Sequence, residues 1–181
     1  FFLYFVRSHR GNQNYIETNN DLGFSKSNQL VLSYDHRFTP NLRMKVETYY
    51  QHQHDIPVEQ KESFFSLANY GASFHQKRMD SLVNEGLGKN YGVEFTLERF
   101  FQENYYFLLT TSLFESKYKP SDGGFRNTAF NGNYVANLLG GYEFDIGNQN
   151  VIAINLRLVR AGGKRYTPVD KEKSIDEGYT V

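Results

Sequence analysis

Two histidines and an acid stand close together at 52–55, in the order His52, Gln53, His54 and Asp55. Residues two apart on a strand point the same way, so the two imidazoles could share a metal ion. The further Asp and His that a metallohydrolase-type motif would place next do not follow. His52 and His54 are therefore a weak metal candidate, and we favour a polar strand end that enters a loop, with no cofactor.

Carboxylates recur at spacings that general acid–base chemistry could use, as Glu94 with Glu98 and Glu143 with Asp145. No His, Ser or Lys partner stands at a fixed distance from either pair. On strands these acids simply repeat along one polar face, and we expect no catalysis from them. We assign this face to the solvated wall of a lumen, formed by Arg43, Lys45, Glu47, Glu94, Glu98, Asn137, Asn155 and Arg157.

Two glycine-rich stretches resemble ligand loops only superficially. Residues 162–165, Gly-Gly-Lys-Arg, lack the frame of a phosphate-binding loop and its following helix. Asp122 and the glycines after it lack the spaced ligands of a calcium loop. Both stretches are predicted to be turns in external loops.

The long segment 53–88 contains aromatics that could stack on a ligand such as a sugar or siderophore, or could equally pack the loop against its neighbours. The candidate ligand-binding residues in the loops are Phe64, Phe65, Tyr70, Phe74 and, in a second loop, Arg126.

Composition narrows the class of protein. The 181 residues carry 20 basic and 20 acidic side chains, and this balance argues against nucleic acid as a partner. No cysteine is present, so disulfides and zinc–thiolate sites are excluded. No apolar run approaches the roughly 20 residues of a membrane helix. Aromatics make up 17% of the chain while mean hydropathy is low, at -0.61, which favours alternating strands.

Alternation of apolar and polar residues predicts an all-β chain with seven antiparallel strands. The hairpin around 89–118 is the clearest, because Tyr91, Val93, Phe95 and Leu97 alternate with polar residues or glycine. The predicted strands are 1–6, 29–38, 42–52, 89–101, 105–118, 133–146 and 150–160. Their connections alternate between long and short, as in a transmembrane β-barrel with short periplasmic turns and long extracellular loops.

Aromatic positions favour the same architecture. One set lies beside the short turns: Phe38, Phe100, Phe101, Tyr105, Tyr106 and Phe144. Tyr50, Tyr91 and Tyr134 lie about 8–10 residues away from them along the strands. That separation projects to roughly 20–25 Å along a barrel axis, close to the height of the apolar band between two aromatic girdles.

Five blocks then resemble the barrel of TonB-dependent outer-membrane receptors. They are LRMKVETYYQHQHDIPV (42–58), GLGKNYGVEFTLERFF (86–101), YYFLLTTSLFESKY (105–118), FRNTAFNGNYVANLLGGYEF (125–144) and AGGKRYTPVD (161–170). The resemblance implies a barrel of about 22 strands around an N-terminal plug. It also implies import of a small-molecule ligand, driven by the inner-membrane TonB complex, in the outer membrane of a Gram-negative bacterium.

Seven strands are about a third of such a barrel, so we expect residues 1–181 to be part of its C-terminal region, with the plug domain, the TonB-contacting segment and the chain termini absent. The expected partners are outer-membrane lipid, the plug, TonB and the cargo. Two other classes stay open: a passive porin or adhesin barrel, and a soluble β-sandwich binding module. An outer-membrane enzyme barrel is a remoter third.

Overall fold

The computed structural model describes residues 2–10, 14–70, 79–147, 149–165 and 175. Its elements in chain order are the 3₁₀ helix η1 (Phe2–Phe5), β1 (Arg7–Arg10), β2 (Asn14–Glu17), β3 (Lys26–Thr39), β4 (Leu42–Glu59), η2 (Leu67–Asn69), β5 (Leu82–Gln102), β6 (Tyr105–Lys119), β7 (Arg126–Asn127), β8 (Tyr134–Ile146) and β9 (Asn150–Ala161). No helix in these ranges is long and apolar enough to cross a membrane.

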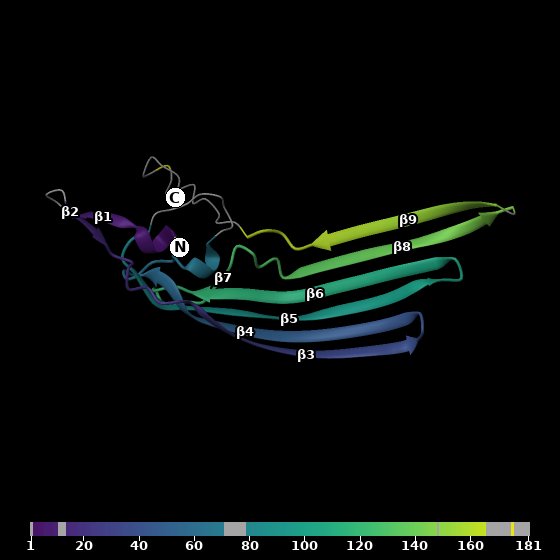
Figure 1. Ribbon diagram of the computed structural model, residues 1–181, viewed down its shortest axis with the longest axis horizontal. Coiled ribbons are helices and arrows are strands. Elements are labelled where there is room, and N and C mark those ends of the chain that lie inside the picture. The colour runs from purple at the N-terminus through teal and green to yellow at the C-terminus, as the bar shows by residue number, and fades with distance from the viewer. Residues whose placement is uncertain (1, 11–13, 71–78, 148, 166–174, 176–181) are drawn as a thin grey trace.

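One antiparallel sheet dominates the structure (Figure 1). Its six long strands are neighbours in the order β3-β4-β5-β6-β8-β9, and the two-residue strand β7 pairs with β6 beside this path. The prediction of an all-β chain with an antiparallel sheet of about seven strands is confirmed. Six of the predicted strands are in it, and its seventh member is β7 in place of the strand predicted at 1–6. Within the described ranges β3 pairs only with β4, and β9 only with β8, so both outer strands have one unpaired edge.

The N-terminal prediction is wrong. Residues 1–6 were expected to form a strand, but Phe2–Phe5 forms the helix η1. The connection expected between the predicted strands 1–6 and 29–38 contains the hairpin β1–β2 and the start of β3. The reason is long-range: the carbonyl of Leu3 accepts a hydrogen bond from the Asn19 side chain at 2.8 Å, and Val6 is buried. The Leu3 carbonyl is therefore hydrogen-bonded and the Val6 side chain is buried although neither residue joins the large sheet.

The strands β4 and β5 also run further than predicted, into the segment 53–88 that was expected to be irregular. The ladder continues to Glu59 and Leu82 through two register shifts. Pro57 lies beside these shifts, where a missing N–H is tolerated. Gly86 permits the strands to approach, because a Cβ there would lie 2.6 Å from Cγ1 of Val58. Proline and glycine thus shape irregular strands here and do not end them.

The pairing registers divide the long strands into two unlike faces. The apolar face carries no Asp, Glu, Lys or Arg along 28–38, 42–50, 91–97, 105–113, 134–144 and 150–158. Its side chains include Leu30, Leu32, Tyr34, Met44, Val46, Tyr50, Tyr91, Val93, Phe95, Leu97, Phe107, Leu109, Leu113, Leu138, Tyr142, Ile152, Ile154, Leu156 and Leu158. The polar face carries Asp35, Arg37, Arg43, Lys45, Glu47, Glu94, Glu98, Glu143, Asp145 and Arg157. The period of two that the sequence showed is therefore maintained across all six strands.

Little of the apolar face is covered by the described chain. Leu30 is 73% exposed on β3, Leu113 is 57% exposed on β6 and Ile154 is 60% exposed on β9. The buried hydrophobic side chains among the described residues are Val6, Ile56, Val58, Met79, Leu82 and Tyr118. All of them belong to the end of the sheet where β1, β2 and the long connections lie (Figure 1).

The connections of the long strands are sorted by length. The short ones, which follow β3, β5 and β8, gather at one end of the sheet, and the chain leaves β4 and β6 for the long ones at the other end (Figure 1). We call these the short-turn end and the long-connection end. Successive short turns are also staggered in one direction. Leu42 at the start of β4 pairs with Arg99, yet β5 continues to Gln102; Tyr105 pairs with Tyr142, yet β8 continues to Ile146.

Candidate functional site

The polar face brings together all eight residues that the sequence assigned to a lumen wall. Arg43 of β4 links three neighbouring strands. Its guanidinium binds Asp35 of β3 and lies 3.9 Å from the Glu98 carboxylate of β5. Lys45 lies 2.7 Å from Glu47 on the same strand. Arg43 and Lys45 are thus held by lateral and axial ion pairs, and the side chains of these pairs are half-buried or partly exposed.

The two carboxylates that suggested acid–base chemistry, Glu94 and Glu98, do not converge. They are four residues apart on one strand, or about 13 Å at the rise of a β-strand. Glu98 lies near Arg43, and Glu94 accepts a hydrogen bond from Ser112 Oγ at 3.5 Å. The close acidic neighbours are instead Glu47 and Glu94, which are directly opposite in the β4–β5 register. Strand pairing creates this juxtaposition, so spacing along the sequence did not predict it.

Further along the same face Asn137 donates to Thr110 Oγ1 at 3.1 Å. Asn155 accepts from the Tyr106 hydroxyl at 2.8 Å across β8. That bond passes over Gly141, where a Cβ would lie 2.6 Å from the Tyr106 ring. Asp145, next to the short turn, accepts from Asn104 Nδ2 at 3.1 Å. The polar side chains of β8 and β9 are therefore joined to those of β6 by hydrogen bonds.

His52 and His54 lie side by side on β4 with ring centroids 6.0 Å apart. His54 Nδ1 lies 3.3 Å from the Asp55 carboxylate, which also binds Lys26 at 2.8 Å. Within the part of the chain that the structure describes, no three His, Asp or Glu side chains are grouped to hold a metal ion. The Lys26 ammonium group already occupies the Asp55 carboxylate, and its positive charge disfavours a metal ion beside the two histidines.

The loop aromatics separate into two kinds. Phe65 and Tyr70 pack edge to face, with centroids 6.1 Å apart, while Phe64 is 71% exposed. Phe74 lies outside the described residues. The two long connections are held together: Ser121 Oγ accepts from the Ser63 amide at 3.0 Å, and Asn69 Oδ1 accepts from the Ala129 amide at 2.7 Å. Packing thus accounts for Phe65 and Tyr70, and Phe64 is left available to a ligand.

Arg126, the other loop candidate, is engaged by Asp122. Its Nη1 donates to Asp122 Oδ1 at 2.6 Å, and this hydrogen bond holds the pKa of the Asp122 carboxyl below its ordinary value. The Gly124 amide also donates to Asp122 at 3.3 Å. The stretch 122–124 is therefore a turn closed by an arginine, in keeping with the prediction of a turn.

A cluster of asparagines around Glu115 was not predicted. Asn131 is fully buried and donates to Glu115 Oε2 at 3.2 Å, while Asn133 donates to Glu115 Oε1 at 2.7 Å. Arg165 donates from Nη2 to Asn133 Oδ1 at 2.7 Å. The repeated Asn at 127, 131 and 133 was the available sequence signal, but its partner Glu115 comes from another strand.

Gly162 belongs to the same region, because its amide donates to the Tyr134 carbonyl at 2.9 Å. A Cβ at Gly162 would lie 1.6 Å from the Gly132 carbonyl oxygen, so only glycine fits. Arg165 of this stretch is used to clamp Asn131 and Asn133. Gly162, at the start of the predicted turn at 162–165, therefore permits a close backbone contact with Gly132.

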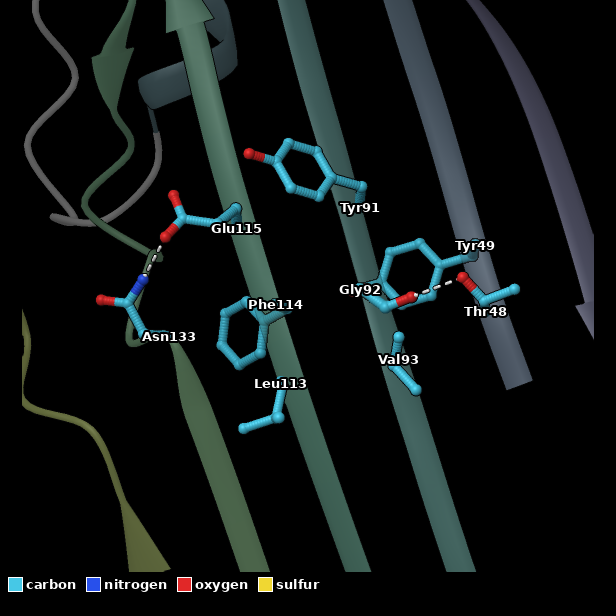
Figure 2. Close-up of a pocket in the computed structure, with 9 residues that line it drawn as sticks. All are labelled: Thr48, Tyr49, Tyr91, Gly92, Val93, Leu113, Phe114, Glu115 and Asn133. Atoms are coloured by element: carbon cyan, nitrogen blue, oxygen red, sulfur yellow. Dashed lines mark hydrogen bonds between the residues drawn. The ribbon is translucent and has the colours of Figure 1, made fainter. Parts of the chain in front are cut away.

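Figure 2 shows a shallow groove at the level of Tyr91, about 370 Å³ in volume. It is lined by Thr48, Tyr49, Tyr91, Gly92, Val93, Leu113, Phe114, Glu115 and Asn133. The Glu115 carboxylate faces Asn133, and Thr48 Oγ1 donates to the Gly92 carbonyl at 3.2 Å. These polar groups are paired with one another, so the groove offers aromatic and aliphatic surface to an occupant.

Two candidate sites are therefore present. One is the polar face with its ion pairs, and the other is the long-connection end, where hydrogen bonds join two loops and Phe64 is exposed. Comparison of the chain with protein-family models, with curated proteins and with solved structures gave no match.

Proposed function

We propose that this chain is part of an outer-membrane receptor barrel that binds a scarce nutrient, such as a siderophore–iron complex or a carbohydrate, and imports it with TonB-coupled energy. The apolar face contacts lipid, the polar face lines the lumen around a plug, and the long connections reach outside the cell and capture cargo.

The observation that carries the proposal is the uncharged apolar face, which spans six long strands and has almost no cover from the described chain. Apolar area of this extent on a soluble monomer would be costly, at about 25 cal/mol for each Å² exposed. A soluble β-sandwich needs a second sheet over that face, and the described residues place none there. A lipid bilayer supplies the cover without one.

Three further features support a barrel. Short turns gather at one end and long connections at the other, as in bacterial outer-membrane barrels. The stagger of successive short turns is what tilted strands in a closed barrel require. The free edges of β3 and β9 are long, and such edges are normally paired or protected. Neighbouring strands of the same barrel would pair with both.

Energy-coupled import rests on the resemblance of five sequence blocks to TonB-dependent receptors. The polar face fits that role, because it presents charged side chains, some of them joined in ion pairs, to a surface that a plug could contact. Passive diffusion through a porin is the second candidate, since the same faces and connections suit it.

The test uses the complete protein in its native cell. We expect it in the outer-membrane fraction after a urea wash, with heat-modifiable mobility on gels, and we expect nutrient-limited growth to require both the receptor and TonB. Recovery as a soluble monomer without detergent would overturn the barrel. A membrane protein whose uptake is unchanged in a TonB deletion would instead be a passive channel.

A further inference from the structure

Basic side chains gather on one side of the sheet, where the apolar face approaches the long-connection end. We define the basic belt as Lys26 on β3, His52 and His54 on β4, Lys89 on β5, Lys117 on β6 and Arg160 on β9. All six share the apolar face. Each lies 10–13 residues from the short turn of its own strand, or about 23–30 Å along an axis inclined at about 45° to the strands.

The belt concentrates like charge. His52 pairs with Lys89, and Lys89 pairs with Lys117, so three basic residues stand side by side on three neighbouring strands. Like charges directly opposite each other on a sheet are destabilising. Two carboxylates lie nearby: Asp55 binds Lys26 at 2.8 Å, and Glu115 lies 3.4 Å from Lys117. Cations outnumber these acids, which leaves room for an external anion.

Two of the cations are held against aromatic rings. Lys89 Nζ lies 4.5 Å from the Phe125 ring centroid, and the Arg160 guanidinium lies 5.9 Å from that of Tyr134. Such contacts position a cation without neutralising its charge. On the polar face, next to the His52–Lys89 pair, the cross-strand pair is uncharged: Asn90 donates to Gln51 at 2.7 Å. The excess charge is therefore confined to the apolar side of the sheet.

We propose that the basic belt binds the phosphate groups of lipids in the outer leaflet, whose acyl chains cover the apolar face beside it. The inference rests on the proposed barrel. Lys89 is two residues beyond Tyr91 on the same face, or about 7 Å further toward the long-connection end. Cations just beyond an aromatic row stand at the depth where lipid headgroups begin.

The experiment uses the complete protein in phosphatidylcholine nanodiscs that contain lipid A, a phosphorylated glycolipid, and native mass spectrometry counts the lipid A bound. The belt variant combines Lys89→Gln, Lys117→Gln and Arg160→Gln. Its matched control combines Arg37→Gln, Lys45→Gln and Arg157→Gln, which removes the same charge from the polar face. Inorganic phosphate is titrated as a competitor in a separate arm.

We expect roughly five-fold weaker lipid A binding for each belt cation removed, or about 100-fold for the triple variant, and near-unchanged binding in the control. Heat-modifiable mobility verifies that both variants fold. Equal lipid A binding by folded belt and control variants would overturn the belt and leave the barrel intact. Displacement of lipid A by millimolar inorganic phosphate would also overturn it, because it would indicate a site for a free anion. A protein that does not enter nanodiscs would instead overturn the barrel.

Discussion

The strands β4 and β5 behave differently at their two ends. Toward the short turns their side chains alternate strictly, the apolar ones are half-buried or exposed, and charges on the opposite face form ion pairs. Toward the long connections the register shifts twice, and Ile56, Val58 and Leu82 are buried. Under the proposed barrel, the short-turn end would face lipid, whereas the long-connection end has a small core of its own. This difference within single strands marks where we place the membrane boundary.

The largest expected effect comes from charging the apolar face. Leu97→Arg places a guanidinium at the short-turn end of the uncharged stretch 91–97 and is expected to destabilise the barrel by about 2 kcal/mol, between the cost of such a charge at the bilayer midplane and its cost at the interface. Its neighbour Glu98 lies on the polar face, so Glu98→Gln is the matched control with little effect. The fraction of heat-modifiable protein in outer membranes measures both. Equal damage by the two substitutions would contradict the assignment of the faces.

The separate core at the long-connection end is tested through Asn19. This residue is fully buried, donates to the carbonyls of Leu3 and Met79 at 2.8 and 2.9 Å, and accepts from the Leu82 amide at 3.0 Å. Asn19→Ala leaves these backbone groups without partners, and we expect a loss of about 1–3 kcal/mol. Hydrogen exchange at the Leu82 amide should accelerate, while amides near the short turns should not change.

Asn20→Ala provides the control, because Asn20 is exposed and bonds only Glu17 among the described residues. We expect a change of less than about 0.5 kcal/mol for this exposed substitution. Loss of exchange protection along the whole of β5 in the Asn19 variant would indicate that the two ends unfold as one unit, against the separation drawn above.

A smaller effect is expected at Tyr106, whose hydroxyl bonds Asn155 over Gly141. Tyr106→Phe removes one partner of a single hydrogen bond and should cost about 1 kcal/mol. Denaturant titration of the folded barrel in detergent measures it. A cost above about 3 kcal/mol would indicate that the polar face is drier than a lumen wall.

The smallest effect is a pH dependence of the second long connection. Hydrogen bonding to Arg126 lowers the pKa of Asp122, so this contact stabilises the loop at neutral pH and its contribution is lost as pH falls through the lowered value. Exchange protection of the Gly124 amide, which donates to Asp122, should therefore decline below about pH 4. Asp122→Asn should remove that pH dependence, and its persistence in the variant would implicate another acid.

The alternating strands could be predicted because their pattern is local: Tyr91, Val93, Phe95 and Leu97 need only the period of two. The polar face could be predicted for the same reason: the alternation along each strand places Arg43 of β4 and Glu98 of β5 on the face opposite the apolar residues. Their ion pair, and the opposition of Glu47 and Glu94, depend on register, which the sequence does not state.

The wrong predictions at 1–6 and 53–88 share one physical cause, which is contacts between residues far apart in the sequence. The segment 53–88 was interpreted as a loop, yet within it Gly86 permits a close approach to Val58 on the partner strand. The helix η1 forms where a strand was predicted, and the Asn19 side chain ties the Leu3 carbonyl to that of Met79, far along the chain. Buried hydrogen bonds at the long-connection end join residues about 60 positions apart, and no local pattern reports them.

The central claim is that the odd-numbered side chains of 93–98 face lipid and the even-numbered ones face an aqueous lumen. Residues 1–181 contain no cysteine, so single cysteines at 93–98 can each carry a fluorophore in the complete protein in vesicles, once any cysteine elsewhere in it has been replaced by serine. We predict quenching by brominated lipid at 93, 95 and 97, and quenching by aqueous iodide at 94, 96 and 98. The absence of lipid quenching at 93, 95 and 97 would contradict the account.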